Sequence, residues 1–507
     1  MARPKKITSP DELHAVGYGA LIKRFSLPSV PHHCQSFIHP RGERKTVVGP
    51  TGNDEFYPPR YRTGETLGDQ LEFALKNEGV NLTILTLVFQ KAETAELVEY
   101  IRSTPTGKYA RRAWFLYEFL TGKRLPLADL NQGRYDDLLP EDTYFTGPGD
   151  LSRRHMIRNN LLGNRAFCPV IRKTTALDGF IRANLDQRCL AVLKKYPDDV
   201  LKRALDYLFT KETKSSFEIE RVTPDQKRAG RFVELLRRAG REEYLTKAAL
   251  LDLQHAIVDA RFANSDYRAT QNYVGETVRI GQERVHFVSP CPLDLPDLMA
   301  GLLDACRQME QAKVNPVLTA TVASFGFVFM HPFDDGNGRM HRFLIHHILA
   351  RSGFSPEGVI FPVSATMLKQ RAAYDETLEL FSKPLMPLVD YRLDEQTGEM
   401  TVTNETGVYY RYIDFTVIAE HLFRFIEQTI ETELSSEFDF LTRYDEAKQR
   451  IQNIVDMPDH SIDLFIRLCM PNQGHITGGK RQRFFGKLTD VEITAMETCI
   501  REVFRQK

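Results

Sequence analysis

The sequence predicts a mainly α fold that contains two short β hairpins. Apolar residues recur at helical spacing in several segments before residue 240, again between 296 and 351, and over 414–507. Residues 272–288 instead carry β-branched and aromatic side chains on both sides of Gly281-Gln282, a pattern typical of a hairpin. A second hairpin is predicted at 389–402, with its turn between Asp394 and Gly398. We therefore expect helical regions interrupted by two hairpins.

Composition along the chain suggests four regions. The first part is rich in Pro, Gly and His, and its prolines exclude a long helix, so an irregular arm is expected. The next region is predicted to be helical, and its first helix ends near Glu78 because Gly79 follows as a stop. Near the end of the chain, the basic run 478–487 fits a small helical or winged-helix module. The regions are an arm at 1–65, a helical region at 66–240, a core at 245–390 and a helical C-terminal region at 405–507.

Composition and charge exclude several classes of protein. The 507 residues carry 67 Lys and Arg against 67 Asp and Glu, and 42% are hydrophobic, as in a soluble globular protein of about three domains. This balance argues against a protein that coats nucleic acid or an anionic membrane. The seven cysteines never form C-x-x-C, so neither a disulfide framework nor a zinc finger is indicated. Because the longest apolar runs are shorter than the ~18 residues of a membrane span and no secretory signal is recognised, a cytoplasmic protein is expected.

One stretch carries the chemistry: residues 331–342, His-Pro-Phe-Asp-Asp-Gly-Asn-Gly-Arg-Met-His-Arg, between two apolar helical segments. Gly336 and Gly338 allow positive φ and close backbone approach, so successive N–H groups can bind an anion at the start of the following helix. Arg339 and Arg342 lie three residues apart in the first turn of that helix, where both guanidinium groups can reach phosphate oxygens. The pattern predicts a phosphate-binding loop.

Three further residues complete this site. Asn337 adds a neutral side-chain donor. Asp335 can hold a Mg²⁺ ion that bridges two phosphates, since Mg²⁺ binds one or two carboxylates together with water and phosphate oxygens. His331, at the end of the preceding helix, is a base that titrates near neutral pH. Together these residues predict phosphoryl or nucleotidyl transfer.

Two other interpretations of the motif are less favourable. A plain glycine-rich turn does not explain why a base, a carboxylate and two arginines occur together within twelve residues. A transition-metal site would use His331, Asp335, His341, His346 and His347. The spacing of five between His341 and His346 does not place both rings on one helical face, and no H-E-x-x-H is present.

The motif resembles that of Fic-domain proteins, H-P-F-x-[D/E]-G-N-G-R-x-x-R, and every specified position is matched. The resemblance implies a helical core with a β-hairpin flap. It also implies AMPylation, the transfer of AMP from Mg²⁺-ATP to a Ser, Thr or Tyr hydroxyl of a target protein. The related Doc kinases carry Lys where this chain has Gly338, which favours nucleotidyl transfer over phosphorylation. The implied roles are base for His331, Mg²⁺ ligand for Asp335, α- and β-phosphate binding for Gly336, Asn337 and Gly338, general phosphate binding for Arg339 and γ-phosphate binding for Arg342.

The hairpin at 272–288 is similar in kind to the flap of this family, which clamps the nucleotide and pairs its edge with the backbone of the target. Tyr273, Val274 and Gly275 are the residues expected on the nucleotide side. Strand pairing of this kind is recognition by β-augmentation, and a purely structural hairpin is the alternative. By analogy, Tyr374 on a later helix is expected to line the adenine pocket.

Many members of the family carry an inhibitory helix, [S/T]-x-x-x-E-[G/N], whose Glu pairs with the second motif arginine. The segment from Ala74 to Gly79 is the upstream candidate, with Ala74 in place of Ser or Thr. We expect Glu78 to pair with Arg342 and thereby to exclude the γ-phosphate, because both anions compete for one bidentate donor. The alternative is a solvent-facing Glu in the last turn of a helix.

The sequence thus predicts a protein adenylyltransferase with ATP as substrate and Mg²⁺ as cofactor, restrained by Glu78. One alternative is removal of AMP at the same site, with Glu78 orienting a water. Another is a non-catalytic nucleotide sensor whose basic C-terminal module binds DNA. The expected partner is a target protein whose hydroxyl side chain is presented at the flap edge. Self-modification and homo-oligomerisation stay open, nucleic acid is not favoured, and no membrane is expected.

Overall fold

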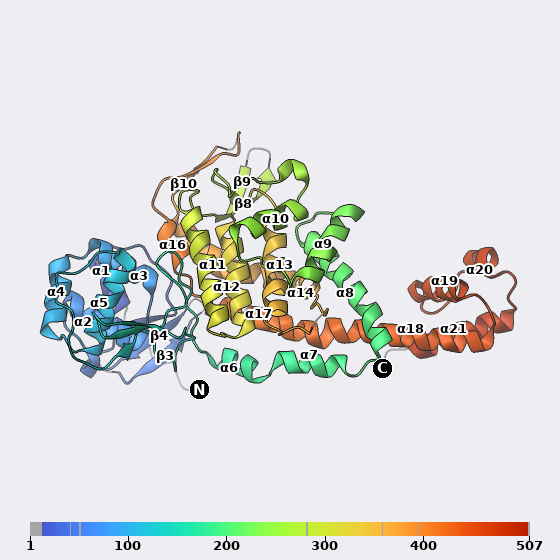
Figure 1. Ribbon diagram of the computed structural model, residues 1–507, viewed down its shortest axis with the longest axis horizontal. Helices are drawn as coiled ribbons and strands as arrows, with labels where there is room; N and C mark the ends of the chain where they lie inside the picture. The colour runs from blue at the N-terminus through green and yellow to red at the C-terminus, as the bar shows by residue number, and fades with distance from the viewer. Residues whose placement is uncertain are drawn as a thin grey trace, which may run out of the picture.

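The computed structural model describes residues 13–504, except 41, 50, 51, 280, 281, 357 and 395. The molecule is elongated, with an N-terminal unit, a central helical unit and a C-terminal helical extension arranged in a row (Figure 1). A large buried apolar cluster lies in each of the three units. The prediction of a mainly α protein is confirmed.

The N-terminal unit begins with a four-stranded sheet of order β1-β2-β4-β3. The pair β2–β4 is parallel, and the two outer pairs are antiparallel. The expectation of an irregular arm over 1–65 is therefore wrong for most of its described residues. Pro31, Pro40 and Pro58 lie outside the strands, where a missing N–H removes no ladder hydrogen bond. The elements are β1 (His14–Val16), α1 (Tyr18–Arg24), β2 (Cys34–Ile38), β3 (Lys45–Val48), β4 (Asn53–Tyr57) and the 3₁₀ turn η2 (Pro59–Tyr61).

Four helices and a second small sheet complete this unit. Ala113, Trp114 and Leu116 of helix α5 are fully buried at its centre. A three-stranded sheet of order β5-β7-β6 follows α5, which the prediction of a helical region over 66–240 did not include. The elements are α2 (Leu67–Phe73), the π-helical turn η3 (Ala74–Glu78), α3 (Leu82–Lys91), α4 (Thr94–Ser103), α5 (Lys108–Thr121), β5 (Asp136–Asp137), β6 (Asp150–Ser152) and β7 (Ile157–Asn159).

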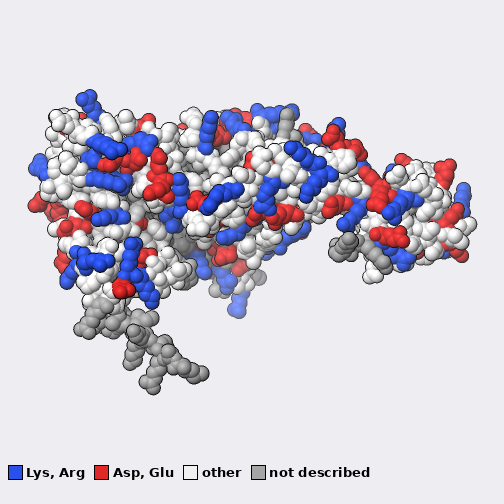
Figure 2. Space-filling model, turned by 90° about the horizontal axis from the view of Figure 1, so that it is seen from below, with Lys and Arg blue, Asp and Glu red and all other residues white. Residues whose placement is uncertain are grey.

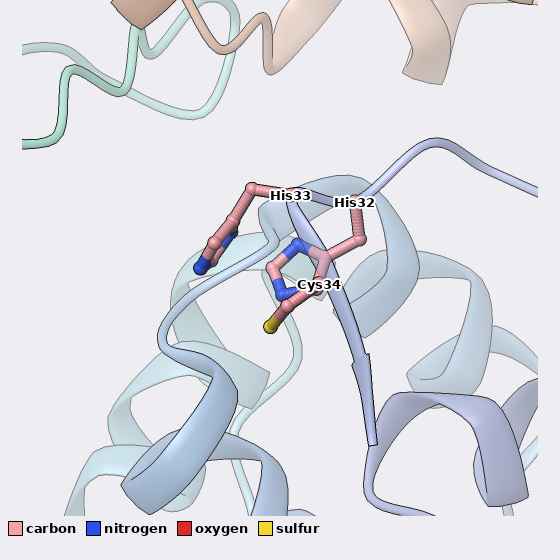
Figure 3. Close-up of side chains that lie close together, drawn as sticks. All are labelled: His32, His33 and Cys34. Atoms are coloured by element: carbon pink, nitrogen blue, oxygen red, sulfur yellow. The ribbon is translucent and has the colours of Figure 1, made fainter. Parts of the chain in front are cut away.

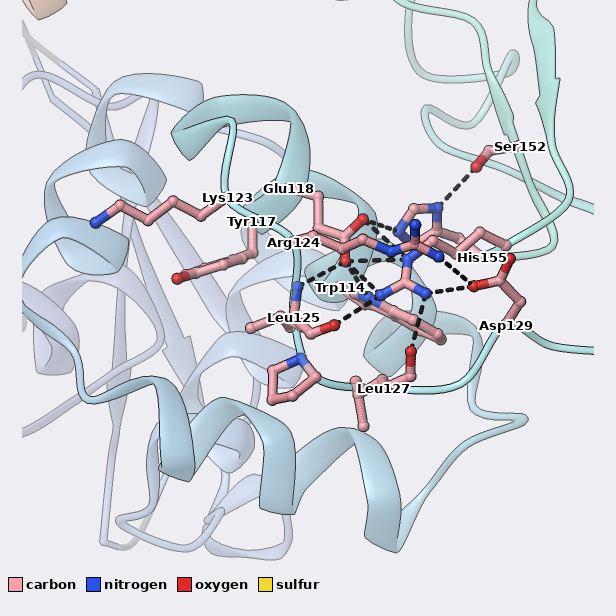
Figure 4. Close-up of polar contacts among 12 residues, drawn as sticks. Trp114, Tyr117, Glu118, Lys123, Arg124, Leu125, Leu127, Asp129, Ser152 and His155 are labelled. Atoms are coloured by element: carbon pink, nitrogen blue, oxygen red, sulfur yellow. Dashed lines mark hydrogen bonds and ion pairs between the residues drawn. The ribbon is translucent and has the colours of Figure 1, made fainter.

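A polar network around Glu118 ties α5 to the loops that follow it (Figure 4). The Glu118 carboxylate accepts hydrogen bonds from Trp114 Nε1 at 2.8 Å and Arg154 Nη2 at 2.9 Å. It also accepts from the backbone N–H of Leu125 at 2.9 Å and lies 3.1 Å from His155 Nε2. Glu118 and Arg154 are largely buried and compensate each other's charge, and the more exposed Asp129 is a second ion-pair partner of Arg154.

Helix α12 (Pro316–Met330) forms the centre of the middle unit. It is apolar on all sides and almost completely buried, as expected for a helix enclosed by others. The helices α11, α13 and α17 pack against it. The apolar cluster of this unit reaches from Leu162 to Phe438 and therefore extends beyond the predicted core of 245–390. The helices of the unit are α6 (Thr175–Arg182), α7 (Leu185–Leu193), α8 (Asp198–Ile219), α9 (Gln226–Arg238), α10 (Lys247–Ile257), η4 (Ala260–Phe262), α11 (Leu295–Gln311), α13 (Asn337–Arg351), α14 (Val363–Lys369), α15 (Arg371–Leu385), η5 (Met386–Leu388), α16 (Gly407–Arg411), α17 (Thr416–Gln428) and η6 (Thr429–Leu434).

Both predicted hairpins are present. The strands β8 (Tyr273–Arg279) and β9 (Gln282–Val288) are antiparallel, with Tyr273 opposite Val288. The turn expected at Gly281-Gln282 lies partly outside the described residues, since Gly281 is not among them. The strands β10 (Tyr391–Leu393) and β11 (Met400–Val402) form the second antiparallel pair.

The C-terminal extension is helical and is joined to the middle unit by α18 (Ser435–Ile454). Phe438 of this helix packs in the central apolar cluster, whereas Ala447 and Ile451 pack against α19 and α21. The described residues from 405 onward contain no strand, so the winged-helix interpretation is wrong and the helical one is confirmed. The remaining elements are α19 (Asp459–Cys469), η7 (Met470–Asn472), α20 (Gly478–Phe485) and α21 (Asp490–Phe504).

Positive and negative side chains are intermixed over the face shown in Figure 2, in keeping with the balanced net charge. Within the described part of the chain, none of the helices is both long enough and apolar enough to span a membrane.

Candidate active site

The motif loop joins two buried helices and is held by its own side chains. Helix α12 ends at Met330 and is capped by His331, whose φ of 47° is left-handed, and α13 begins at Asn337 after Gly336, whose φ is 93°. The Asn337 side chain accepts from the Phe333 N–H at 3.1 Å and donates to the Phe333 carbonyl at 2.7 Å. Asn337 thus closes the loop, and a phosphate contact by its amide stays a prediction.

Arg268, which the sequence did not mark as a functional residue, clamps the base of the flap to the motif. Its backbone N–H donates to the Pro332 carbonyl and its Nε to the His331 carbonyl, both at 2.9 Å. Its Nη1 and Nη2 donate to the carbonyls of Thr270 at 2.7 Å and Pro290 at 2.6 Å. Burial lowers the pKa of this guanidinium to about 10, so it remains charged at neutral pH. A single Arg in a polar loop has no spacing by which the sequence could reveal this role.

The His331 ring has the tautomer that a general base needs. Its Nδ1 lies 3.2 Å from the Val328 carbonyl, and since a carbonyl only accepts, Nδ1 carries the proton. The lone pair is therefore on Nε2. Burial, helped by the nearby Arg268 charge, lowers the pKa of His331 to about 4 against the opposing charges of Glu220 and Asp335. The ring is neutral at pH 7 and can accept a proton.

Asp335 and Arg339 form an ion pair one helical turn apart. Arg339 Nη2 lies 2.7 Å from Asp335 Oδ1, which also accepts from the Gly336 N–H at 2.6 Å. Both contacts use Oδ1, and the Asp335 side chain is 51% exposed, so Oδ2 is accessible to a cation. A half-exposed carboxylate beside a phosphate-binding loop suits Mg²⁺.

Arg342 is buried and pairs with a different glutamate from the predicted one. Its Nε donates to Ser216 Oγ at 2.9 Å and its Nη2 to the Ser216 carbonyl at 2.6 Å. The same Nη2 lies 2.9 Å from Glu220 Oε1. A Cβ at Gly338 would clash with the same Glu220 carboxylate. An anionic group therefore already lies over the start of α13, where the helix favours negative charge.

The predicted ion pair between Glu78 and Arg342 is wrong. Glu78 ends η3 in the N-terminal unit, where it is 1% exposed and its Oε2 accepts from the Tyr18 N–H at 2.7 Å. Burial raises the pKa of this carboxyl to about 7. The solvent-facing alternative is equally wrong, because Glu78 belongs to the buried interior of a separate unit.

The segment from Ser216 to Arg221 has the spacing that was sought at 74–79, with Ser at the first position and Glu at the fifth. Arg221 occupies the position where the pattern requires Gly or Asn, so the segment does not match the full pattern. Arg221 nevertheless adopts φ of 55°, the left-handed conformation that Gly and Asn adopt most easily at a helix end. The Ser-x-x-x-Glu spacing alone was the signal that could have identified it.

The helices α8 and α13 face each other through matching polar residues four apart. Beyond the Ser216 and Glu220 contacts, Glu212 Oε1 lies 2.8 Å from His346 Nε2, and both side chains are buried. Glu212 also accepts from the Ser364 N–H at 2.9 Å. Glu212, Ser216 and Glu220 thus meet His346, Arg342 and Gly338, and this repeat of four fixes the register of α8 on α13.

The flap residues lie at the exposed side of the hairpin. Val274 is 42% exposed, Gly275 is exposed, and the register shifts between these two residues. Among the described residues, β8 is paired only with β9, so its outer edge is available. The role of Tyr273, Val274 and Gly275 beside a nucleotide stays a prediction.

Tyr374 lies behind Arg342. It is 2% exposed, and its hydroxyl accepts from Arg342 Nη1 at 3.4 Å. In this structure Tyr374 supports the guanidinium, and the adenine contact expected by analogy stays a prediction.

The central unit is helical, with the predicted phosphate-binding motif at the N-terminus of α13 and a hairpin beside it. This arrangement can be compared with known protein families. Residues 244–349 match the model of the Fic/DOC family. The region that contains the motif is therefore similar to the Fic/DOC family, as the motif indicated.

Individual relatives are similar over this region alone. The chain is 34% identical over 125 residues to the protein adenylyltransferase fic-1 of Caenorhabditis briggsae, which covers 24% of this chain and 21% of that protein. It is 33% identical over 130 residues to the protein adenylyltransferase Fic of Drosophila willistoni, covering 25% and 23%. The matched region thus spans less than a quarter of the length of these relatives.

Solved structures of Fic proteins are also similar to the chain. A Fic family protein from Desulfovibrio desulfuricans G20 is 17% identical, with a TM-score of 0.38, and the match covers 55% of this chain and 80% of that one. Fic-1 from Caenorhabditis elegans is 18% identical, with a TM-score of 0.31, and the match covers 71% and 90%.

Proposed function

We propose that the protein is a protein adenylyltransferase that transfers AMP from ATP to a hydroxyl of a target protein, and that Glu220 restrains it. The observation that carries this proposal is the anion seat at the start of α13, where the Glu220 carboxylate lies over Gly338 and pairs with Arg342. A site that holds a carboxylate in this way also fits a phosphate.

His331 performs the proton transfer in this proposal. Its neutral Nε2 takes the proton of the target hydroxyl while the hydroxyl oxygen attacks the α-phosphorus of ATP. The bond from that phosphorus to the bridging oxygen breaks, and pyrophosphate leaves with the electron pair. The N–H groups at the start of α13 and the guanidinium of Arg339 stabilise the departing charge.

The donor set fits Mg²⁺, with Asp335 as the protein ligand. The ion would neutralise charge between the phosphates when Mg²⁺-ATP is bound. Asp335 is already oriented for such a role by the Gly336 N–H and Arg339, which both contact its Oδ1.

Glu220 restrains the enzyme because it occupies Arg342. The Ser216 and Glu220 oxygens take the donors at Nε and Nη2 that a γ-phosphate would need. The target is a protein segment that pairs with the outer edge of β8, which brings its hydroxyl toward His331 without reading much side-chain sequence.

The test uses intact mass and label transfer after incubation of the full chain with ATP labelled in the α-phosphate. We expect Glu220→Gly to raise self-modification by AMP at least about tenfold over wild type, since a hydrogen bond to a charged group contributes ~1.5–3 kcal/mol. His331→Ala in the Glu220→Gly background abolishes it.

Glu78→Gln is the control, because it changes the other candidate glutamate, which lies in the N-terminal unit and bonds to Tyr18, and it leaves the AMP signal at the wild-type level. Transfer of label from the γ-phosphate instead of the α-phosphate would contradict the proposal and indicate a kinase. Loss of AMP from a modified protein that depends on Glu220 would favour AMP removal.

A further inference from the structure

His32, His33 and Cys34 lie together at the start of β2, in the N-terminal unit and apart from the region that matches the Fic/DOC family (Figure 3). Each offers one ligand atom, and these atoms all lie within 4.8 Å of one another. Two imidazoles and a thiol are the donors that Zn²⁺ binds in proteins. We propose that His32, His33 and Cys34 form a Zn²⁺ site whose fourth position is taken by water.

The His32 ring is already oriented as in metal-ligating histidines. Its Nε2 lies 3.0 Å from the backbone carbonyl of Glu78, so Nε2 carries the proton and Nδ1 has the lone pair. The other contact of the ring, from Asn81 Nδ2 to His32 Nδ1, is the longer one at 3.3 Å. The Asn81 side chain is separately anchored to the Pro31 carbonyl and the Ile84 N–H. A cation at Nδ1 therefore replaces one weak contact and leaves the orienting one intact.

Both imidazoles are poised as neutral ligands. Burial lowers the pKa of His32 to about 3 and that of His33 to about 4, with a charge on the neighbouring imidazole or on Arg172 acting in the same direction. The two rings contact edge to face with centroids 4.3 Å apart. Neither ring needs to lose a proton to bind Zn²⁺. Cys34, which is buried, loses one, so each Zn²⁺ bound releases one proton and forms one Zn–S bond.

Two carboxyl groups, those of Glu78 and Asp414, lie near the cluster. Glu78 is buried, and among the described residues its Oε1 has no hydrogen-bond partner. Burial, followed by the Glu78 charge, raises the pKa of the Cys34 thiol to about 12, so the thiol loses its proton only when a cation binds. On the other side, the Asp414 carboxylate acts on His33 and pairs with Arg172 at 3.2 Å. A divalent cation would compensate the negative charge of the Cys34 thiolate and would favour the ionised form of the buried Glu78 carboxyl.

The site also joins separate parts of the chain. His32 is bonded to the backbone carbonyl of Glu78 at the end of η3, and the charge of Asp414, which precedes α17 of the central unit, acts on His33. A bound ion would therefore tie the first sheet to its neighbours, and binding that favours the folded state raises the melting temperature.

The test begins with full-length protein stripped by a chelator and titrated with Zn²⁺ alone against a chromophoric competitor. We expect one Zn²⁺ per chain, a higher melting temperature with Zn²⁺, and a sulfur-to-metal charge-transfer band when Co²⁺ replaces Zn²⁺. Cys34→Ser loses the band, and Cys34→Ser and His33→Asn each weaken Zn²⁺ binding at least tenfold.

Cys291→Ser is the control, since Cys291 is a partly exposed cysteine outside the cluster, and it retains binding and the band. His33→Asn separates ligand loss from misfolding, because His33 is only partly buried and the variant is expected to keep the circular dichroism of the wild type. Equal Zn²⁺ binding by His33→Asn and wild type, or a band that survives Cys34→Ser, would overturn the proposal.

Discussion

The Arg342 side chain is buried, with only 1% exposed, and residues from two other helical segments bind its guanidinium. Ser216 and Glu220 bind it from the end of α8, and Tyr374 binds it from α15. A buried guanidinium without an acceptor is costly, so removal of Glu220 leaves a charge that needs another anion. Arg342 can therefore bind Glu220 in the restrained enzyme and a phosphate once Glu220 has been removed.

His331 leads to a prediction on pH. Because its pKa is lowered to about 4, the neutral base is fully present well above that value and is lost only as the pH falls through it. We expect AMP transfer by Glu220→Gly to be nearly flat between about pH 5.5 and 8, without the rise near 6.5 of an ordinary histidine. Single-turnover rates across this range provide the measurement. A tenfold rise between pH 5.5 and 7.5 would show that the ring titrates normally.

At the scale of elements, α8 is positioned by polar contacts that recur every four residues. Glu212, Ser216 and Glu220 all face α13, and only the last of them reaches the anion seat. Glu212 accepts from both the backbone and the hydroxyl of Ser364 and contacts His346, so it anchors α8 from one side. We therefore expect the restraint on Arg342 to depend on Glu212, which lies two turns before Glu220.

This register leads to a prediction for Glu212→Gln. The new amide NH₂ faces groups that already donate to Glu212, namely the N–H and hydroxyl of Ser364, so one hydrogen bond is lost. We expect the free energy of unfolding to fall by about 2 kcal/mol, as measured by urea denaturation. AMP transfer rises because Glu220 is held less firmly. In the Glu220→Gly background the same change gives no further rise, since the two residues act through one contact. An equal increase in both backgrounds would show that Glu212 acts independently of Glu220.

At the scale of the whole molecule, three apolar clusters lie in a row, and α18 runs from the central one into the last (Figure 1). The N-terminal cluster includes Tyr412 of the central region, and Val408 of α16 packs against it. Units with their own cores and few shared residues need not unfold together.

Glu118→Gln tests this arrangement. The change leaves the largely buried Arg154 without its main partner, so we expect it to destabilise the N-terminal unit by about 3 kcal/mol. Calorimetry is expected to show more than one transition, of which only one shifts. AMP transfer by Glu220→Gly is expected to persist when Glu118→Gln is added at 25 °C. A uniform shift of all transitions would indicate a single cooperative unit.

Much of the fold followed from local patterns. Helices α12 and α13, both hairpins and the helical C-terminal region were predicted from apolar spacing and turn residues, because these depend on neighbours in the chain. The sheet at 14–57 was missed because its strands are short and separated by prolines. Its parallel pair β2–β4 joins segments that no local pattern relates.

The motif at 331–342 was determined by sequence alone, because its groups occupy adjacent turns and the covalent chain already brings them together. Only the tertiary structure shows that Glu220, and not Glu78, is the glutamate that pairs with Arg342. Both end a helical segment, but Glu220 reaches Arg342 across 122 residues of chain because α8 packs on α13. Glu78 lies instead beneath β2, beside His32. Sequence specifies which groups are present, and packing decides which distant groups meet.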